Sequence, residues 1–192
     1  MSIRTALIAT AAALAFAAQA QALLYTGQLL GSNEVPPNAS PGNGLVNVDF
    51  DIVAHTMAID VTFADLIGTT AAAHIHCCAA PGANAGVATT TPSFPSFPNG
   101  VSSGSYSRIF DTLDAATYSA AFLGASGGTA AGAEAALLAA LDAGRTYFNL
   151  HTTAFPGGEI RANLAAAQIP EPSTAALIAL GLAAVALRRR RV

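Results

Sequence analysis

The sequence predicts an all-β protein: an antiparallel β-sandwich with one short helix, flanked by an apolar targeting helix at each end. Two adjacent segments alternate apolar and polar residues with the period of a β-strand. Glycine and proline gather between the alternating segments, where they favour turns. Only one internal segment has the apolar spacing of a helix, so strands must supply most of the fold.

The first 22 residues have the layout of a secretory signal peptide. Arg4 supplies a positive charge, residues 6–18 form a short apolar stretch, and two overlapping Ala-Gln-Ala sequences within residues 18–22 offer cleavage sites. The alternative is an uncleaved membrane anchor, but the apolar stretch is short for a helix that spans a bilayer. We therefore expect an exported domain over residues 23–168.

The clearest strands lie near the start of this domain, at residues 45–53 and 55–63, and they are expected to form a hairpin. Their predicted core side chains are Val46, Val48, Phe50, Ile52, Met57, Ile59, Val61 and Phe63. Residues 24–30 form a further strand, and a loop rich in proline, glycine and asparagine follows it. Later strands are expected at residues 71–76, 104–110, 145–151 and 158–164.

Two segments interrupt the strands. Residues 77–103 form a long loop rich in glycine, proline, threonine and serine, and loops longer than about 12–15 residues are usually functional or disordered. Residues 132–143 are the one predicted helix, because three leucines form an apolar stripe and Gly144 is placed to end it.

The charge of the domain limits its partners. Residues 23–168 contain three arginines and ten acidic residues, a formal charge of −7, and the chain has no lysine. An acidic surface repels nucleic acids and anionic lipids, so neither is expected as a partner.

Three histidines are the candidate metal ligands. His74 and His76 lie two residues apart, so in a strand both imidazoles project from one face, roughly 7 Å apart at the backbone. In the strand 145–151, His151 and Asn149 occupy the face opposite the apolar residues. If the two strands are neighbours, three nitrogens converge into a site suited to zinc or copper. The alternative is that these histidines are solvated or hydrogen-bonded and bind no metal.

Cys77 and Cys78 follow these histidines directly. In an exported protein they favour a disulfide, here between adjacent residues, although neighbouring Cα atoms lie closer than in most disulfides. Pairing between molecules, thiolate ligation beside His76 and two free thiols are the alternatives that remain open.

The turn 156–158 leads into the last strand, where Glu159 and Arg161 are expected on one outward face. They form either a surface ion pair, which contributes at most about 1 kcal/mol, or groups that, with Asn149, hold the histidines in orientation. No catalytic serine elbow, phosphate-binding loop or Cys-x-x-Cys motif is present in the sequence.

Four short motifs carry a family resemblance: Glu34-Val35-Pro36-Pro37, Ala73-His74-Ile75-His76, Asn149-Leu150-His151-Thr152 and Pro156-Gly157-Gly158-Glu159-Ile160-Arg161. In order and spacing they resemble the CHRD domain, found in chordin and in many microbial secreted proteins. The resemblance implies an immunoglobulin-like β-sandwich, by analogy with copper/zinc superoxide dismutases, and no settled activity. The chain has too few histidines for both a copper and a zinc site, so superoxide dismutation is not expected.

Residues 169–192 resemble a second known signal. Pro170-Glu171-Pro172 precedes an apolar run, residues 174–187, and Arg188, Arg189, Arg190 and Arg191 follow it. This layout resembles the PEP-CTERM sorting signal of Gram-negative bacteria. The resemblance implies export, transient anchoring in the inner membrane by the apolar helix, and removal of the signal by an exosortase.

The expected function is therefore that of an exported, non-catalytic binding or structural module at the cell surface or in the extracellular matrix. Its expected partners are the export machinery, an exosortase-type sorting enzyme, and exopolysaccharide or other surface proteins. The alternative is a secreted protein that binds copper or zinc through His74, His76 and His151. A hydrolase that uses Glu34 or Glu159 ranks last, because no paired acid and base can be placed near a nucleophile.

Overall fold

The computed structural model describes residues 23–167, which contain nine strands and two α-helices. The strands are β1 (Leu23–Leu30), β2 (Asn43–Asp51), β3 (Thr56–Ala64), β4 (Thr70–Cys77), β5 (Gly86–Val87), β6 (Gly104–Asp111), β7 (Thr146–Thr152), β8 (Ile160–Asn163) and β9 (Ala165–Ala166). The helices are α1 (Ala120–Ala125) and α2 (Ala130–Asp142), and two short 3-10 turns lie at Gly31–Asn33 and Ala115–Thr117. All seven predicted strands are present with ends that differ by two residues at most, and the structure adds β5 and β9.

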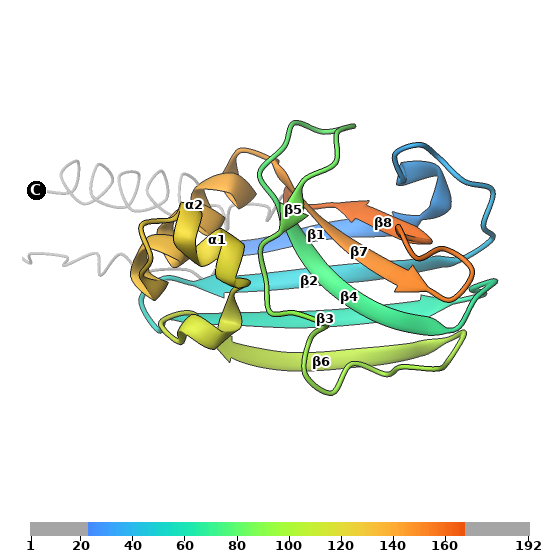
Figure 1. Ribbon diagram of the computed structural model, residues 1–192, viewed down its shortest axis with the longest axis horizontal. Coiled ribbons are helices and arrows are strands. Elements are labelled where there is room, and N and C mark those ends of the chain that lie inside the picture. The colour runs from blue at the N-terminus through green and yellow to red at the C-terminus, as the bar shows by residue number, and fades with distance from the viewer. Residues whose placement is uncertain (1–22, 168–192) are drawn as a thin grey trace, which may run out of the picture.

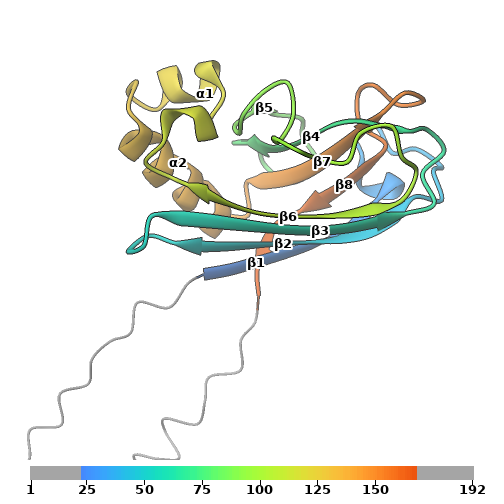
Figure 2. The same ribbon diagram turned by 90° about the horizontal axis from the view of Figure 1, so that it is seen from below.

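The strands form one antiparallel sheet in the order β5-β4-β7-β8-β1-β2-β3-β6, with β9 paired to β1. The sheet curls back on itself, so that its two halves face each other as two layers (Figures 1 and 2). We call β1, β2, β3 and β6 the β2 layer, and β5, β4, β7 and β8 the β4 layer. Leu30 and Arg161 form the only pair that joins β1 to β8 within the described residues. The two layers are therefore the halves of one curled sheet.

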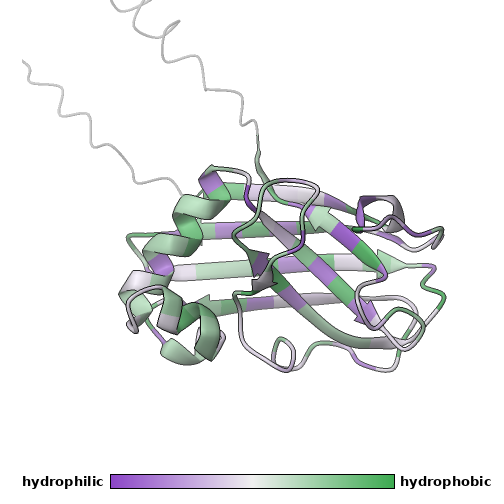
Figure 3. Cartoon of the chain, turned by 45° about the horizontal axis from the view of Figure 1, so that its top comes forward, coloured by the Kyte–Doolittle hydropathy of each residue, from purple (hydrophilic) through white to green (hydrophobic). Residues whose placement is uncertain are grey.

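The core lies between the two layers. Hydrophobic and hydrophilic residues alternate along the long strands (Figure 3), as expected when one face is buried and the other is not. Of the eight predicted core side chains, Ile52 is misplaced: β2 ends at Asp51, and Ile52 is 41% exposed in the following turn. The Asp51 carboxylate accepts hydrogen bonds of 2.8 Å from the amides of Val53 and Ala54, which ends the strand early.

Two helices, not one, close one end of the sandwich (Figures 1 and 2). The predicted helix is α2, which starts earlier than expected because the Thr129 hydroxyl caps it by accepting from the Gly132 amide at 3.1 Å. Gly144 follows the helix with a φ of 63°, as its predicted role in ending the helix requires. The helix α1 was not predicted, since six residues are too few to show a helical period.

The long loop 77–103 is packed into the protein. Its aromatic side chains Phe94 and Phe97 are buried in the core, and the Phe94 ring stacks on Phe148 of β7 at 5.9 Å. The loop also contains β5, which pairs with the end of β4. The loop therefore forms part of the hydrophobic core and covers the sheet beside it.

The predicted targeting segments, residues 1–22 and 169–192, lie outside the described residues. Within residues 23–167, neither helix combines the length and the apolar character that crossing a membrane requires.

Candidate metal centre

The pairing of β4 with β7 brings the three predicted histidines onto one face. The register places His74 opposite Asn149, His76 opposite Tyr147, and Ala72 opposite His151. This is the outer face of the β4 layer, because the residues between them point into the core. One ring nitrogen from each histidine lies within 4.8 Å of the others, and the imidazole centroids are 5.3 to 5.9 Å apart. The expectation that the three imidazoles share a face is confirmed; metal binding stays a prediction.

Most of this face is covered by loops, and only His151 of the three histidines is half-buried and not fully buried. His74 is 7% exposed and His76 is 8% exposed. We call residues 31–42, 78–92 and 153–159 the covering loops. Each imidazole bonds to a carbonyl of these loops: His74 Nε2 to Pro92 at 2.7 Å, His76 Nδ1 to Ala85 at 2.9 Å, and His151 Nδ1 to Pro156 at 3.0 Å.

These hydrogen bonds fix which nitrogen of each ring is free. A carbonyl oxygen only accepts, so the bonded nitrogen must carry the hydrogen, and a neutral imidazole then has its lone pair on the other nitrogen. Those other nitrogens are His74 Nδ1, His76 Nε2 and His151 Nε2, all buried and without a hydrogen-bond partner among residues 23–167. Unpaired buried acceptors are costly, so these three nitrogens are the ones available to a ligand.

The site also keeps the three rings neutral. Burial lowers the pKa of His74, and the neighbouring His151 lowers it further, although the bond to the Pro92 carbonyl opposes this. Burial lowers the pKa of His76 to about 4, against the effect of its carbonyl bond and with the other histidines and Arg161 adding to the decrease. Burial lowers the pKa of His151 as well. Neutral imidazole is the form that ligates metals.

The donor set fits a zinc or copper ion. Imidazole nitrogens suit both metals, and three of them on one ion leave a further coordination position. Nitrogens bound tetrahedrally at about 2.0–2.1 Å lie about 3.3 Å apart. One nitrogen of each ring lies within 4.8 Å of one nitrogen of each of the others, so for these atoms to bind one ion the rings need to approach by roughly 1.5 Å at most.

A stack of planar groups lies behind His76. The Tyr147 ring is parallel to the His76 imidazole, with centroids 4.7 Å apart and planes within 7°. The Arg161 guanidinium lies over the Tyr147 ring, 3.4 Å from its centroid, and because β7 lies between β4 and β8 it approaches from the side away from His76. Arg161 is 1% exposed, and its guanidinium donates to Asn84 Oδ1 at 3.0 Å and to the Ala83 carbonyl at 2.8 Å. The predicted contribution of Arg161 to histidine orientation therefore has a contact path through Tyr147.

Asn149 belongs to a second buried polar group, with Glu34 from the first covering loop. Its side-chain amide donates to Glu34 Oε2 at 3.4 Å. Burial raises the pKa of Glu34 to about 7, although the positive charge of Arg161 and the bond from Asn149 lower it. Gly158 packs directly against this group: a Cβ at Gly158 would lie 2.5 Å from the Asn149 side chain and 2.6 Å from Glu34 Oε1.

Glu159 bonds to loops and not to the histidines, and of the two alternatives for Glu159 and Arg161 the surface ion pair is wrong. Both side chains are buried, and the described residues contain no ion pair between them. The Glu159 carboxylate accepts from the Ser40 and Thr152 hydroxyls and from the Ile67 and Gly68 amides, at 2.6 to 3.1 Å. Burial alone would raise the pKa of Glu159, but these hydrogen bonds outweigh it and hold the pKa below its usual value. Glu159 thus fastens loops to the end of the sheet.

Cys77 and Cys78 are joined by a disulfide, and the residues 23–167 contain no free thiol. Cys77 is buried with the hydrophobic core, on the side of β4 opposite His76. The pair therefore ends β4 without adding a sulfur ligand to the histidine cluster.

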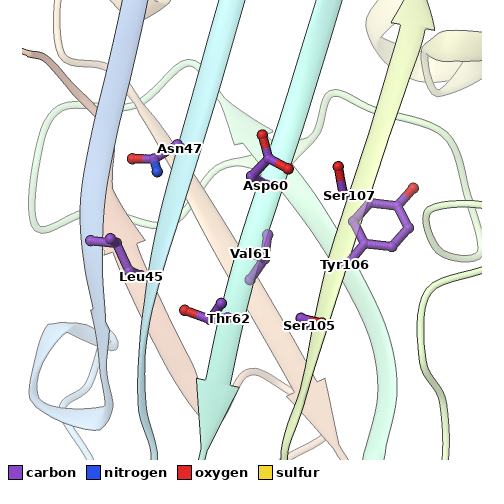
Figure 4. Close-up of a pocket in the computed structure, with 8 residues that line it drawn as sticks. All are labelled: Leu45, Asn47, Asp60, Val61, Thr62, Ser105, Tyr106 and Ser107. Atoms are coloured by element: carbon purple, nitrogen blue, oxygen red, sulfur yellow. The ribbon is translucent and has the colours of Figure 1, made fainter.

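Two hollows mark the outer faces of the layers. One, of about 400 Å³, opens beside His74 and His151, and its other lining residues are Ala71, Ala72, Val87, Thr152, Thr153 and Pro156. The second, of about 210 Å³, lies on the outer face of β2, β3 and β6 (Figure 4). Its outward side chains are Leu45, Asn47, Asp60, Thr62, Ser105 and Ser107. Only the first hollow adjoins the histidine cluster.

Tyr147 was not predicted to take part in the site. It lies two residues before Asn149 in the same strand, so alternation alone places it on the histidine face. Its stacking on His76 depends on the pairing of β4 with β7, and the contact between Glu34 and Asn149 depends on a loop from a distant part of the chain. The sequence carries no signal for those two contacts.

The CHRD domain matches residues 25–164, and the PEP-CTERM protein-sorting motif matches residues 168–191. No curated protein and no solved structure shows a significant match.

Proposed function

Because the chain belongs to the CHRD-domain family and carries a PEP-CTERM sorting motif, we propose that its domain is a non-catalytic module that binds one copper or zinc ion through His74, His76 and His151. The sorting motif implies recognition by an exosortase-type system, and export through a membrane-anchored intermediate to the cell surface of a Gram-negative bacterium. The proposed metal site would therefore work outside the cytoplasm.

One observation carries this proposal: three imidazoles, two of them buried and His151 half-buried, each use one nitrogen to bond a carbonyl, and each leaves the other nitrogen unpaired. A metal-ligating histidine commonly donates its other N–H to a carbonyl or carboxylate, which fixes the tautomer and the ring orientation. The lowered pKa values of the three histidines support the same assignment, because protons compete weakly with a metal for these nitrogens.

Metal content tests the proposal. The purified protein is stripped with a chelator, incubated with copper or zinc, freed of unbound metal, and submitted to elemental analysis. We expect close to one ion per chain. Replacing one ligand, as in His74→Ala or His151→Ala, should weaken binding by at least about a hundredfold, since two nitrogens hold such an ion poorly.

His55→Gln is the matched control, because His55 is the fourth histidine and bonds to Glu134, not to the cluster. It should leave the metal content unchanged. A wild-type protein that takes up no stoichiometric metal would refute the proposal, and so would equal uptake by His74→Ala and His55→Gln.

A second candidate is a metal-independent display module that associates with exopolysaccharide or other surface proteins. It is favoured by the same carbonyl bonds, because they fasten two covering loops to the sheet and could serve the fold alone. In that case His74→Ala and His151→Ala leave surface retention and matrix association of the exported protein unchanged. A clear loss of retention in both variants would count against it.

A further inference from the structure

The ring of Tyr147 separates the buried Arg161 from His76, one of the proposed metal ligands. The Arg161 guanidinium lies 3.4 Å from the centre of the Tyr147 ring, and the other face of that ring stacks on His76 at 4.7 Å. Arg161 is 1% exposed, so little water screens its charge from the site. Any ion bound by His76 must therefore be accommodated close to a fixed positive charge.

The guanidinium cannot easily turn away from this position. Its two terminal nitrogens donate to Asn84 Oδ1 and to the Ala83 carbonyl. The next residue of the same loop, Ala85, accepts from His76 Nδ1 at 2.9 Å, and its amide donates to the Tyr147 hydroxyl at 3.0 Å. One loop thus holds the arginine, the tyrosine and the histidine in a fixed arrangement.

The proposed ligands supply no negative charge to offset that arginine. Within the described residues, the cluster that can hold a metal consists of three histidines and no carboxylate. Glu34 is the acidic group whose charge acts on Arg161, and burial raises its pKa to about 7. Near neutral pH, Glu34 is therefore only partly ionised and offsets the arginine only in part.

Electrostatic repulsion from a fixed charge grows in proportion to the charge of the ion, so a divalent ion is disfavoured twice as strongly as a monovalent one. Among the metals that imidazole ligands suit, copper is the one that proteins also bind in a monovalent state. We propose that this site selects copper(I) over divalent ions, and that Arg161 sets the preference through the Tyr147 ring. This inference rests on the proposed function and names its metal.

The test measures two affinities in the full-length protein at pH 8: copper(I), by anaerobic competition with a chromogenic chelator, and zinc(II), by competition with a zinc chelator. Arg161→Gln removes the charge and should lower the ratio of copper(I) to zinc(II) affinity by about tenfold. Arg161→Lys keeps the positive charge but not the stacked, two-nitrogen contact, so its ratio should lie between those of the wild type and Arg161→Gln. Arg108→Gln removes an exposed arginine from the other layer and is the matched control.

Glu34→Gln gives an independent variant that leaves the arginine in place. At pH 8 it removes a negative charge beside Arg161, so the ratio should rise, opposite to the effect of Arg161→Gln. If Arg161→Gln does not fold, Glu34→Gln alone decides the inference.

The outcomes separate the two proposals. A wild-type protein that binds neither ion refutes the metal site itself. A protein that binds both ions, with a ratio that neither Arg161→Gln nor Glu34→Gln changes, leaves the metal site intact and refutes the role of Arg161.

Discussion

The outer faces of the two layers follow the same sequence rule and end in opposite environments. On the β2 layer, outward residues such as Asp60, Thr62 and Ser107 are exposed to solvent (Figure 4). On the β4 layer, the outward residues His74, Asn149 and Arg161 are buried under the covering loops. Alternation thus assigns a polar side chain to the outer face of a sheet, but the loops decide whether that face meets water.

The difference matters because burial changes the chemistry of ionisable groups. On the covered face, burial shifts the pKa values of the three histidines down and that of Glu34 up, so each group moves toward its neutral form. A polar face under loops can therefore hold neutral ligands close together, which a hydrated face does not. The following substitutions test this contrast, from the largest expected effect to the smallest.

Removing the arginine from each face should give the largest difference. Arg161→Ala should lower the free energy of unfolding by about 4 kcal/mol, because it deletes a buried side chain, its hydrogen bonds and its stacking on Tyr147. Arg108→Ala should cost less than about 1 kcal/mol, since Arg108 is exposed and makes one long bond to the Pro95 carbonyl. Urea unfolding of both variants measures the two values, and equal losses would show that the covered face is not tightly packed.

Glu34→Gln should change how the stability of the protein depends on pH. The pKa of Glu34 in the folded protein is about 7, above its usual 4.5. The contribution of protonated Glu34 to the free energy of unfolding is therefore fully present below pH 4.5 and is lost as the pH rises through 7. Relative to the wild type, the variant should gain up to about 3 kcal/mol between pH 4.5 and pH 8.

Unfolding of both metal-free proteins over this pH range measures the gain, and the histidine contributions cancel in the difference because both proteins contain them. A difference that does not vary with pH would mean that Glu34 is not buried as described.

The fit of the covering loops can be tested at two adjacent glycines. Gly158 has a φ of 131°, and a Cβ there would press on Asn149 and Glu34, so Gly158→Ala should cost about 2 kcal/mol or more. No heavy atom lies within 4 Å of a Cβ at Gly157, so Gly157→Ala should change the stability by less than about 0.5 kcal/mol. Thermal unfolding compares the two, and equal effects would contradict the close contact at Gly158.

The smallest effect is expected on the open face. Asp60→Asn removes an exposed carboxylate from the centre of β3 and should change the stability by less than about 0.5 kcal/mol. Its metal content should equal that of the wild type, since Asp60 lies on the other layer. A loss of metal in this variant would mean that binding depends on the acidic surface and not on the histidine cluster.

Much of the fold could be predicted, because strands with one buried face repeat every two residues. The hairpin of β2 and β3 follows from this periodicity, and the position of α2 follows from its leucine stripe and from Gly144. Ile52 was placed wrongly because alternation continues past the point where the Asp51 carboxylate ends the strand. The helix α1 and the two-residue strands β5 and β9 are too short to produce a period.

The candidate site was predicted in part for the same reason. His74, His76, Asn149 and His151 were placed on one face by counting along two strands, and Arg161 by counting along a third. Glu159 was counted onto the same face, but it precedes β8 and bonds to loop amides instead. The counting rule holds only while the chain remains in a strand.

The sequence by itself determined the alternation of the strands, the set of histidines on one face, and the sorting motif that directs the chain out of the cell. Tertiary structure alone decided that β4 pairs with β7, that three carbonyls fix the imidazole tautomers, and that Arg161 stacks behind His76 through Tyr147. The physical reason is how far apart along the chain the interacting residues lie. Periodicity is a property of neighbours along the chain, whereas burial and hydrogen bonding of the site come from loops that are distant in sequence and meet only when the sheet curls.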